Sequence, residues 1–324
     1  MRVAAIDCGT NSIRLLIADV TAHADGTTTL ADVHREMRVV RLGQGVDATG
    51  LLAPEALART FAAAEDYAEL IRNCAADGTA VERIRFVATS ATRDAGNRAE
   101  FTDGITARLG VAPEVVSGAE EAALSFAGAA SALPALAGEL VLVVDLGGGS
   151  TEFVAGSGAG VQAALSTDMG CVRFTERYLR SDPPTAAEIA AAEAAVEAKL
   201  DDVMAQVPLG DVTKVVGVAG TITTVTAQAL GLAEYEPEVI HAAVVPLGKI
   251  AQAATELLAM TRAERAALGF MHPGRVDVIG AGSLIWATVL RRLAELTHGR
   301  LESATTSEHD ILDGIALGAA GGLH

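Results

Sequence analysis

The sequence is poor in aromatic residues and in cysteine. Phe, Tyr and Trp make up 3% of the 324 residues, whereas half of the residues are apolar, so we expect a large but mainly aliphatic core. The three cysteines, Cys8, Cys74 and Cys171, are odd in number and form no CxxC pair. This pattern argues against a disulfide framework and favours a reducing cytosol.

Long apolar runs are also absent. No uninterrupted run approaches the roughly 20 residues that a membrane-spanning helix needs. Asp7 and Arg14 interrupt the first apolar stretch, which argues against a signal-peptide core. We therefore expect a soluble, cytoplasmic protein with no membrane partner.

Basic residues are few: the sequence has 24 Lys and Arg residues and 41 Asp and Glu residues, which gives a net charge of −17. A duplex-binding surface is usually basic, so we expect no nucleic-acid partner. A few arginines and backbone N–H groups that converge locally can still bind a polyanion. The P-loop motif GxxxxGK[ST] does not occur, and no HxH or HxxxH spacing indicates a histidine metal site.

Short β-branched runs alternate with Ala-rich helical stretches, which is typical of an α/β protein. The chain is too long for one typical core, so we expect two domains. The strands are expected at Val3–Asp7, Ser12–Val20, Ile84–Ala88, Val141–Asp145, Glu152–Ala155 and Lys214–Val218.

Helix starts are marked in several places. A helix is expected from Pro54 to just before Gly78, and three capping-box pairs predict further starts: Ser117 with Glu120, Thr185 with Glu188, and Thr261 with Glu264. The connection around Pro134 places the domain boundary between about residues 125 and 138. We set the domains at 1–127 and 128–324, with the last helix free to pack back on the first domain.

One short pattern occurs twice, as "DCGTNSIR" from Asp7 and as "DLGGGSTE" from Asp145. The paired positions are 138 residues apart, and in each copy an apolar strand runs into Asp, a Gly-containing turn, a hydroxyl residue and a second strand. Such a hairpin exposes backbone N–H groups that can form an anion nest. The duplication predicts one phosphate-binding hairpin in each domain, on the two sides of a central cleft.

The eighth position of the pattern differs, since Arg14 stands in one copy and Glu152 in the other. Arg14 either touches phosphate or pairs with a carboxylate, and the sequence leaves both open. The Asp of each copy can hold a divalent cation, often through water. Trp286 is expected in the core, and Arg-bearing segments such as "MGCVRFTER" and "HPGR" could line a path for a polyanion.

The ordered set of motifs resembles the Ppx/GppA family of exopolyphosphatases and guanosine pentaphosphate phosphohydrolases over essentially the whole chain. The resemblance rests on both hairpins, "ATSATRDAGN" from Ala88, "SGAEEA" from Ser117, and further matches at "RLGQGV", "MGCVRFTE", "GVAGTITT", "HPGRVDVIGAG" and "SEHDILDGIALG". It implies a duplicated actin-like α/β fold (ASKHA, ribonuclease H-like) of two domains. Thr10 stands where the family commonly has Ser, and the hydroxyl is retained.

The resemblance also assigns roles to residues. Glu121 matches the catalytic carboxylate that activates water, and Glu152 matches a second acidic residue that orients water or metal. The residues matched to phosphate binding are Thr10, Asn11, Ser12, Arg93, Gly147, Gly148, Gly149, Ser150 and Thr151. Those matched to a Mg²⁺ site are Asp145, Glu152 and, less directly, Asp7.

The function implied is that of a Mg²⁺-dependent hydrolase that releases terminal orthophosphate from inorganic polyphosphate. Longer family members carry an extra C-terminal helical domain, so we expect short or medium chains as substrates, and the family resemblance also implies a homodimer. Three alternatives stay open: a guanosine pentaphosphate 5′-phosphohydrolase, an actin-superfamily ATP-dependent kinase or ATPase, and a non-catalytic regulator that binds the guanosine alarmone.

Overall fold

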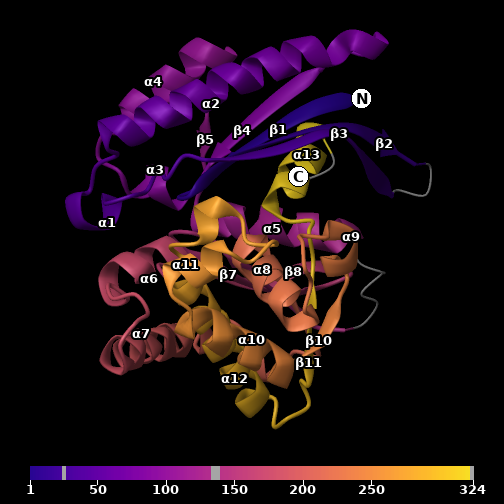
Figure 1. The fold of residues 1–324 in the computed structure, drawn as a ribbon. Coiled ribbons are helices and arrows are strands. Elements are labelled where there is room, and N and C mark those ends of the chain that lie inside the picture. The colour runs from indigo at the N-terminus through magenta and orange to yellow at the C-terminus, as the bar shows by residue number, and fades with distance from the viewer. Residues whose placement is uncertain (24–26, 133–138, 322–324) are drawn as a thin grey trace. The chain divides into compact units, whose positions relative to one another are not determined.

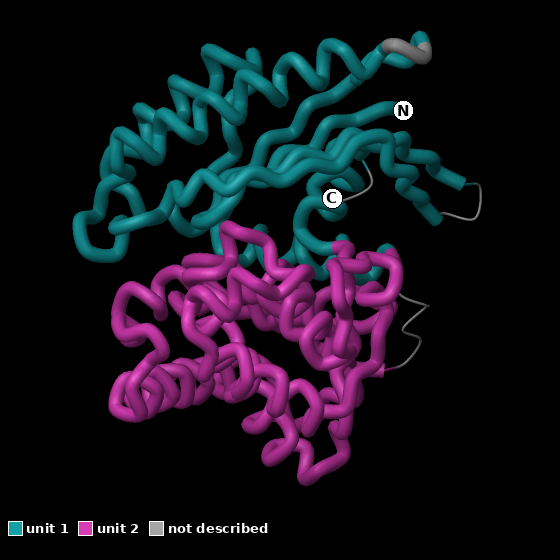
Figure 2. Tube along the Cα trace, in the orientation of Figure 1, with its two compact units in different colours: residues 1–131, 310–324 teal, residues 132–309 magenta. Residues whose placement is uncertain are grey.

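A computed structural model describes residues 1–23, 27–132 and 139–321 of the chain. The chain divides into two compact units, Met1–Ser131 with Asp310–His324, and Ala132–His309 (Figure 2). The sequence placed the boundary after residue 127, and the connection predicted around Pro134 lies outside the described residues. The last helix, α13 (Ile311–Ala319), belongs to the first unit.

The first unit is built on a mixed five-stranded sheet in the order β3-β2-β1-β4-β5. Antiparallel pairs join β1 to β2 and β2 to β3, and β4 and β5 continue the sheet in parallel. The strands are β1 (Arg2–Cys8), β2 (Ser12–Ala22), β3 (Thr28–Val39), β4 (Arg83–Ala88) and β5 (Glu114–Val115). The helical segments are α1 (Val46–Thr49), α2 (Pro54–Asn73), η1 (Cys74–Asp77), α3 (Ser90–Asp94), α4 (Arg98–Leu109), α5 (Gly118–Ala132) and α13.

Helices cover both faces of this sheet. Helices α2 and α4 cover one face (Figure 1). Ile6 and Phe86 point to this face, where Tyr67 and Phe101 are fully buried. Val3 and Ala5 point to the opposite face, where they pack with residues of α5 and α13. Because side chains alternate along a strand, Asp7 continues the face of Val3 and Ala5 and therefore points toward the start of α13.

The second unit repeats this arrangement in a six-stranded sheet with the order β10-β11-β9-β6-β7-β8. Its strands are β6 (Val141–Leu146), β7 (Thr151–Ser157), β8 (Gly160–Thr167), β9 (Lys214–Val218), β10 (Val244–Pro246) and β11 (Ser303–Thr306). Here β6, β7 and β8 form the antiparallel meander, and β9 and β11 continue in parallel from β6. Strands β8-β7-β6-β9-β11 thus follow the same order as the sheet of the first unit, and β10 is an added edge strand.

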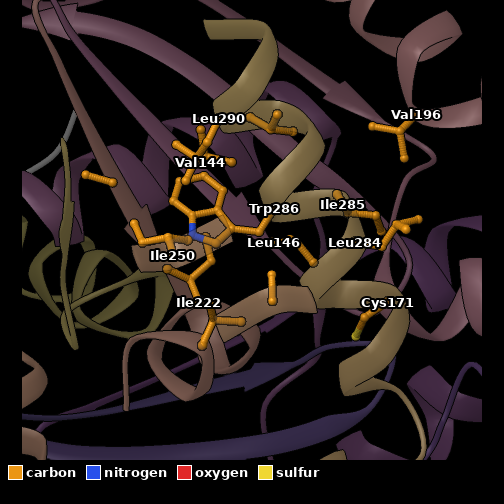
Figure 3. Close-up of a cluster of buried hydrophobic side chains, with 14 of the residues drawn as sticks. Val144, Leu146, Cys171, Val196, Ile222, Ile250, Leu284, Ile285, Trp286 and Leu290 are labelled. Atoms are coloured by element: carbon orange, nitrogen blue, oxygen red, sulfur yellow. The ribbon is translucent and has the colours of Figure 1, made fainter. Parts of the chain in front are cut away.

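The helical segments of the second unit pack around one aliphatic core. They are α6 (Cys171–Tyr178), α7 (Ala186–Met204), η2 (Leu209–Asp211), α8 (Ala219–Leu230), α9 (Pro237–Ile240), α10 (Leu247–Ala259), α11 (Arg262–Ala266), η3 (Pro273–Arg275) and α12 (Ile279–Leu296). Trp286 on α12 is 1% exposed and lies among Val144, Ile222 and Ile250 (Figure 3), so its predicted place in the core is confirmed.

The predicted fold class, a duplicated actin-like α/β fold, is confirmed by the two sheets of matching strand order. All six predicted strands are present, and the three predicted capping boxes mark the starts of α5, α7 and α11. The sequence analysis did not predict β3, β5, β8, β10 and β11. No residue of β3 is fully buried, and its charged residues leave no hydrophobic alternation. No helix among the described residues combines the length and the apolar character needed to cross a membrane.

Candidate functional site

Both copies of the repeated pattern close their turn with the same backbone hydrogen bond. Gly9 N donates to Ser12 O in the first unit, and Gly147 N donates to Ser150 O in the second, each at 3.0 Å. The turns join β1 to β2 and β6 to β7, the central hairpins of the two sheets. The repeat in the sequence is therefore a repeat in three dimensions, with a turn of one shape in each unit.

In the second unit, the carbonyl groups of the turn point to the N-terminus of α6. Gly147 O accepts from Cys171 N at 3.0 Å, and Gly148 O accepts from the N–H of Val172 at 2.9 Å and of Arg173 at 3.2 Å. The Arg173 side chain completes the set, because its Nε donates to Gly149 O at 2.8 Å. Gly170 permits this approach, since a Cβ there would stand 2.2 Å from Gly148 O.

This orientation of the carbonyl groups decides where the N–H groups point. In a trans peptide the C=O of one residue and the N–H of the next point in opposite directions. The N–H groups of Gly148, Gly149 and Ser150 are therefore directed away from α6, on one side of the turn. N–H groups on one side of a turn can form a nest for a phosphate oxygen, and the phosphate-binding role of Gly147–Ser150 stays a prediction.

The turn of the first unit is oriented in the same way by a different segment. Thr10 O accepts from Gly43 N at 2.8 Å, and Asn11 O accepts from the N–H groups of Val40 and Arg41 at 3.0 and 2.8 Å. The N–H groups of Asn11 and Ser12 consequently point away from this segment. The Thr10 hydroxyl lies 2.9 Å from the Ser90 hydroxyl, at the start of α3.

Two predicted acidic residues of the second unit lie side by side. Asp145 and Glu152 are directly opposed in the antiparallel pairing of β6 and β7, which puts both side chains on the same face of the sheet. Both are buried, at 6% and 1% exposure. Ser166 on β8 donates its hydroxyl to Glu152 Oε1 at 2.7 Å. Glu152 is thus a buried carboxylate that accepts a hydrogen bond from Ser166, and not a solvent-facing strand residue.

Thr151 stands beside Glu152 and is fully buried. Its hydroxyl donates to the carbonyl of Met169, in the segment that leads into α6. The phosphate-binding role predicted for Thr151 stays a prediction, and the observed contact ties the end of the turn to the same segment that orients the glycines.

In the first unit, the equivalent pair is Asp7 and Arg14, which are also opposed in the sheet. Arg14 donates from Nε and Nη2 to Asp7 Oδ2, at 2.9 and 2.7 Å, and from Nη1 to Asp310 Oδ2. The question left open by the sequence is answered here, because Arg14 pairs with two carboxylates. Burial raises the pKa of Asp7, while the charge of Arg14 opposes this shift.

Asp310 belongs to the start of α13, where it caps the helix. Its Oδ1 accepts from Leu312 N at 3.0 Å, and Asp313 forms the reciprocal half of a capping box. Arg14 therefore links the first hairpin to the point at which the chain re-enters the first unit. Asp7 Oδ1 is buried and has no hydrogen-bond partner among the described residues.

Glu121 lies in the first turn of α5, as its capping box predicted, yet it is buried, at 6% exposure. Arg93 on α3 donates from Nη1 to Glu121 Oε2 at 3.0 Å and to the carbonyl of Val116 at 2.9 Å. The contact with Arg93 is a charge-assisted hydrogen bond, which fixes the orientation of the Glu121 side chain. The two residues matched to the catalytic base and to the phosphate arginine are thus in direct contact.

The residues present fit a Mg²⁺ ion that keeps part of its water shell. In the described part of the chain, no cluster of three His, Cys, Asp or Glu side chains is placed to hold a metal by itself. Mg²⁺ is usually bound by one or two carboxylates together with substrate phosphates. The buried pair of Asp145 and Glu152 has this chemistry, whereas the charge of Asp7 is already neutralised by Arg14.

Another arginine-bearing segment is held by contacts within the second unit. Arg275, in the "HPGR" segment, donates from Nη1 to Thr224 Oγ1 at 3.1 Å and lies over the ring of Tyr235. The Tyr235 hydroxyl is 2.7 Å from Glu308 Oε1, and burial raises its pKa to about 12. The predicted polyanion path along these segments stays a prediction.

Sequence reasoning missed several residues of these groups, among them Ser90, Ser166, Gly170, Arg173 and Asp310. Arg173 lies in a segment already noted for its arginines, but its contact with Gly149 O depends on how α6 packs. Asp310 carried a usable signal, since Asp310 and Asp313 have the spacing of a capping box. Its pairing with Arg14 joins residues 296 positions apart, which no local pattern reveals.

Comparisons with known proteins define the class. A model of the family described as the Ppx/GppA phosphatase family matches residues 16–317. The chain belongs to this family, which confirms the predicted membership and the predicted class of enzyme, a phosphatase.

Individual relatives agree with this assignment. Exopolyphosphatase 2 of Mycobacterium tuberculosis is 53% identical over 326 residues, which cover 99% of each chain. The crystal structure of a protein described as exopolyphosphatase-like has a TM-score of 0.90 at 44% identity, with 98% of each chain covered. Guanosine-5′-triphosphate,3′-diphosphate pyrophosphatase of Vibrio cholerae is 35% identical over 238 residues, or 73% of this chain and 45% of that protein.

Proposed function

We propose that this chain is an exopolyphosphatase, a Mg²⁺-dependent hydrolase that releases terminal orthophosphate from inorganic polyphosphate of short to medium length. The observation that carries the proposal is the similarity over 99% of both chains to a protein named exopolyphosphatase 2. The geometry within each unit supplies the groups that phosphoanhydride hydrolysis needs: oriented N–H donors, arginine and buried carboxylates.

Glu121 is the proposed general base. Its carboxylate, which accepts from Arg93 through Oε2, is the group that we assign to orienting the attacking water and accepting its proton. The charge-assisted hydrogen bond keeps the carboxylate in one rotamer, which places the base at a defined point. Arg93 is 27% exposed and also offers positive charge to a phosphate oxygen.

The N–H groups of Gly148, Gly149 and Ser150 are proposed to bind phosphate oxygens, with the hydroxyl of Ser150 as a further donor. Such preorganised dipoles stabilise charge without having to reorient during the reaction. Asn11 and Ser12 offer the same kind of donors in the first unit. Asp145 and Glu152 would hold Mg²⁺, which, when bound, neutralises phosphate oxygens and so favours attack by water.

The runner-up is a guanosine pentaphosphate 5′-phosphohydrolase. The Vibrio cholerae relative gives it support, but this chain spans less than half of that protein and is less similar to it. A kinase or a non-catalytic alarmone-binding regulator is not favoured, because the chain belongs to a family of phosphatases. The cytoplasmic location and the homodimer predicted from the sequence are carried forward as proposals, and light scattering after size exclusion tests the second.

A chain-length analysis tests the proposed function. The purified protein with Mg²⁺ should release orthophosphate from linear polyphosphates of defined length, and gel analysis should show shortening by one unit at a time. Transfer of phosphate to an added small acceptor without release to water would instead identify a kinase. An absence of orthophosphate release from every polyphosphate would overturn the proposal.

A further inference from the structure

The second unit contains an open, arginine-rich pocket of about 360 Å³ that shares no residue with the hairpin turns or with Glu121. Its walls come from the segment that follows α6, from α11, and from the beginning of α12. Three arginines line it, Arg180, Arg262 and Arg265, together with two carboxylates, Asp182 and Asp277. The guanidinium groups therefore outnumber the carboxylates.

The two carboxylates are already engaged. Both oxygens of Asp182 accept from Arg262 N at 2.9 Å, and its Oδ1 also accepts from Arg265 Nη2 at 2.9 Å. Asp277 Oδ1 lies 2.9 Å from Arg262 Nε. These contacts account for the charge of Arg262 and for one nitrogen of Arg265.

Arg265 is the central group, because its side chain is 7% exposed. Its Nε is buried and has no hydrogen-bond partner among the described residues. A buried guanidinium with an unpaired donor is unusual, since a polar group removed from water normally keeps a partner. Arg265 therefore has capacity for an acceptor that the surrounding chain does not provide.

The start of α12 adds positive potential to the same pocket. Gly280 and Ala281, in the first turn of this 18-residue helix, both line the pocket, and no side chain caps the helix start. The Arg265 guanidinium lies over this turn, since a Cβ on Gly280 would stand 2.9 Å from its Nη1. A guanidinium next to the positive end of a helix dipole brings together two kinds of donor that one bound anion can contact.

We propose that this pocket binds a phosphate oxyanion, either free orthophosphate or one phosphate group of an oligophosphate. Arg265 and the N–H groups of Gly280 and Ala281 form the inner part of the site. Arg180, whose side chain forms no ion pair within the described residues, approaches from the rim. Arginine suits this ligand because its planar fork matches two oxygens of a phosphate. The site is additional to the proposed substrate site and does not depend on it.

The test is a titration of the ¹⁵N-labelled full-length chain, followed by NMR, without Mg²⁺ so that no turnover occurs. Orthophosphate and linear triphosphate are added separately, and the amide signals of Gly280 and Ala281 report the pocket. Saturable shifts of these signals with orthophosphate identify free phosphate as a ligand. Saturable shifts with triphosphate alone identify an oligophosphate. Either result supports the proposal.

Variants define which residues act. Arg180→Gln changes an exposed side chain and should raise the Kd read from Gly280 about tenfold, the loss expected for one charge-assisted contact. Arg265→Gln should abolish the shifts. Arg291→Gln is the matched control, because Arg291 lies on α12, as the reporting residues do, but outside the pocket. This variant should titrate like the wild type.

Two results would overturn the proposal. One is an absence of shifts at Gly280 and Ala281 with both ligands. The other is an Arg180→Gln protein that titrates like the wild type. Because this variant changes only an exposed residue, it still tests the proposal if Arg265→Gln fails to fold. The signals of Gly148 and Gly149 report the proposed substrate site in the same spectra, so failure of one proposal is distinguished from failure of the other.

Discussion

Arg93 Nη1 lies 3.0 Å from Glu121 Oε2 and, from the same nitrogen, 2.9 Å from the carbonyl of Val116. The contact joins α3, which follows strand β4, to the first turn of α5. A carboxylate held in this way has a defined orientation, a property that a general base needs. The pair therefore links the most specific sequence motifs of the first unit to one chemical role.

Replacing the proposed base should remove turnover while sparing binding. We expect Glu121→Gln to lower kcat for orthophosphate release by about 10²–10⁴-fold, the usual contribution of a general base. Phosphate binding, measured by isothermal titration calorimetry, should change little. Glu120→Gln is the matched control, because the neighbouring Glu120 is exposed and serves the capping box with Ser117. Near-normal turnover in Glu121→Gln would falsify the assigned role.

Arg93 should act in two ways that kinetics can separate. We expect Arg93→Gln to raise KM about tenfold, because a charge-assisted contact to phosphate is lost, and also to lower kcat, because Glu121 loses its orienting partner. In the Arg93→Gln, Glu121→Gln double variant, kcat should fall no further than in Glu121→Gln alone. Strictly additive effects on kcat would show that the contact does not position the base.

Gly170 should be required for the shape of the turn in the second unit. A Cβ at this position would stand 2.2 Å from Gly148 O, so Gly170→Ala must displace either α6 or the turn. We expect a loss of about 1–3 kcal/mol in the free energy of unfolding, together with a raised KM.

Gly248→Ala on α10 is the control for this variant, since its new Cβ meets no atom within 4 Å. It should keep normal KM and gain up to about 1 kcal/mol of stability. Urea denaturation and steady-state kinetics measure both effects. A Gly170→Ala protein with unchanged KM and stability would contradict the proposed packing of Gly148 against α6.

Removing Arg14 should leave two buried carboxylates without their cation. We expect Arg14→Met to lower the free energy of unfolding at pH 7 by about 3–5 kcal/mol, the cost of breaking a buried ion pair from one side. Arg38→Met, which breaks the more exposed ion pairs of Arg38 with Glu36 and Asp66, should cost less than about 1 kcal/mol.

The penalty in Arg14→Met should depend on pH. Burial raises the pKa of Asp7, and Arg14 counteracts this, so the variant should have a still higher pKa at this group. A raised folded-state pKa means that the folded protein binds the proton more tightly than the unfolded chain, so stability falls as pH rises. The stability difference from the wild type should therefore shrink between pH 7 and pH 5. A constant difference over this range would contradict the account.

The sequence predicted the repeated hairpins because their chemistry is local. Strand, Asp, glycine turn and hydroxyl residue are adjacent in the chain, and the same is true of the capping boxes that start α5, α7 and α11. The edge strand β3 was missed because it has no fully buried residue and its charged residues leave no hydrophobic alternation.

The contacts that orient the site residues could not be predicted from local sequence patterns. Arg173 reaches Gly149 O only because α6 packs behind the turn, and Arg14 meets Asp310 only because the chain returns to the first unit. The eighth position of the repeat shows the same limit. Its two alternatives for Arg14 had equal support in the sequence. One pairing partner, Asp7, lies opposite Arg14 in the same hairpin, and the other, Asp310, lies almost at the other end of the chain.

The most direct test of the central claim compares two substrates under one set of conditions. Orthophosphate release with Mg²⁺ is measured from linear polyphosphates of defined length and from guanosine pentaphosphate, and kcat/KM is determined for each. The account predicts the highest kcat/KM for a short or medium polyphosphate, with activity lost on removal of Mg²⁺. A higher kcat/KM for guanosine pentaphosphate than for every polyphosphate would contradict it.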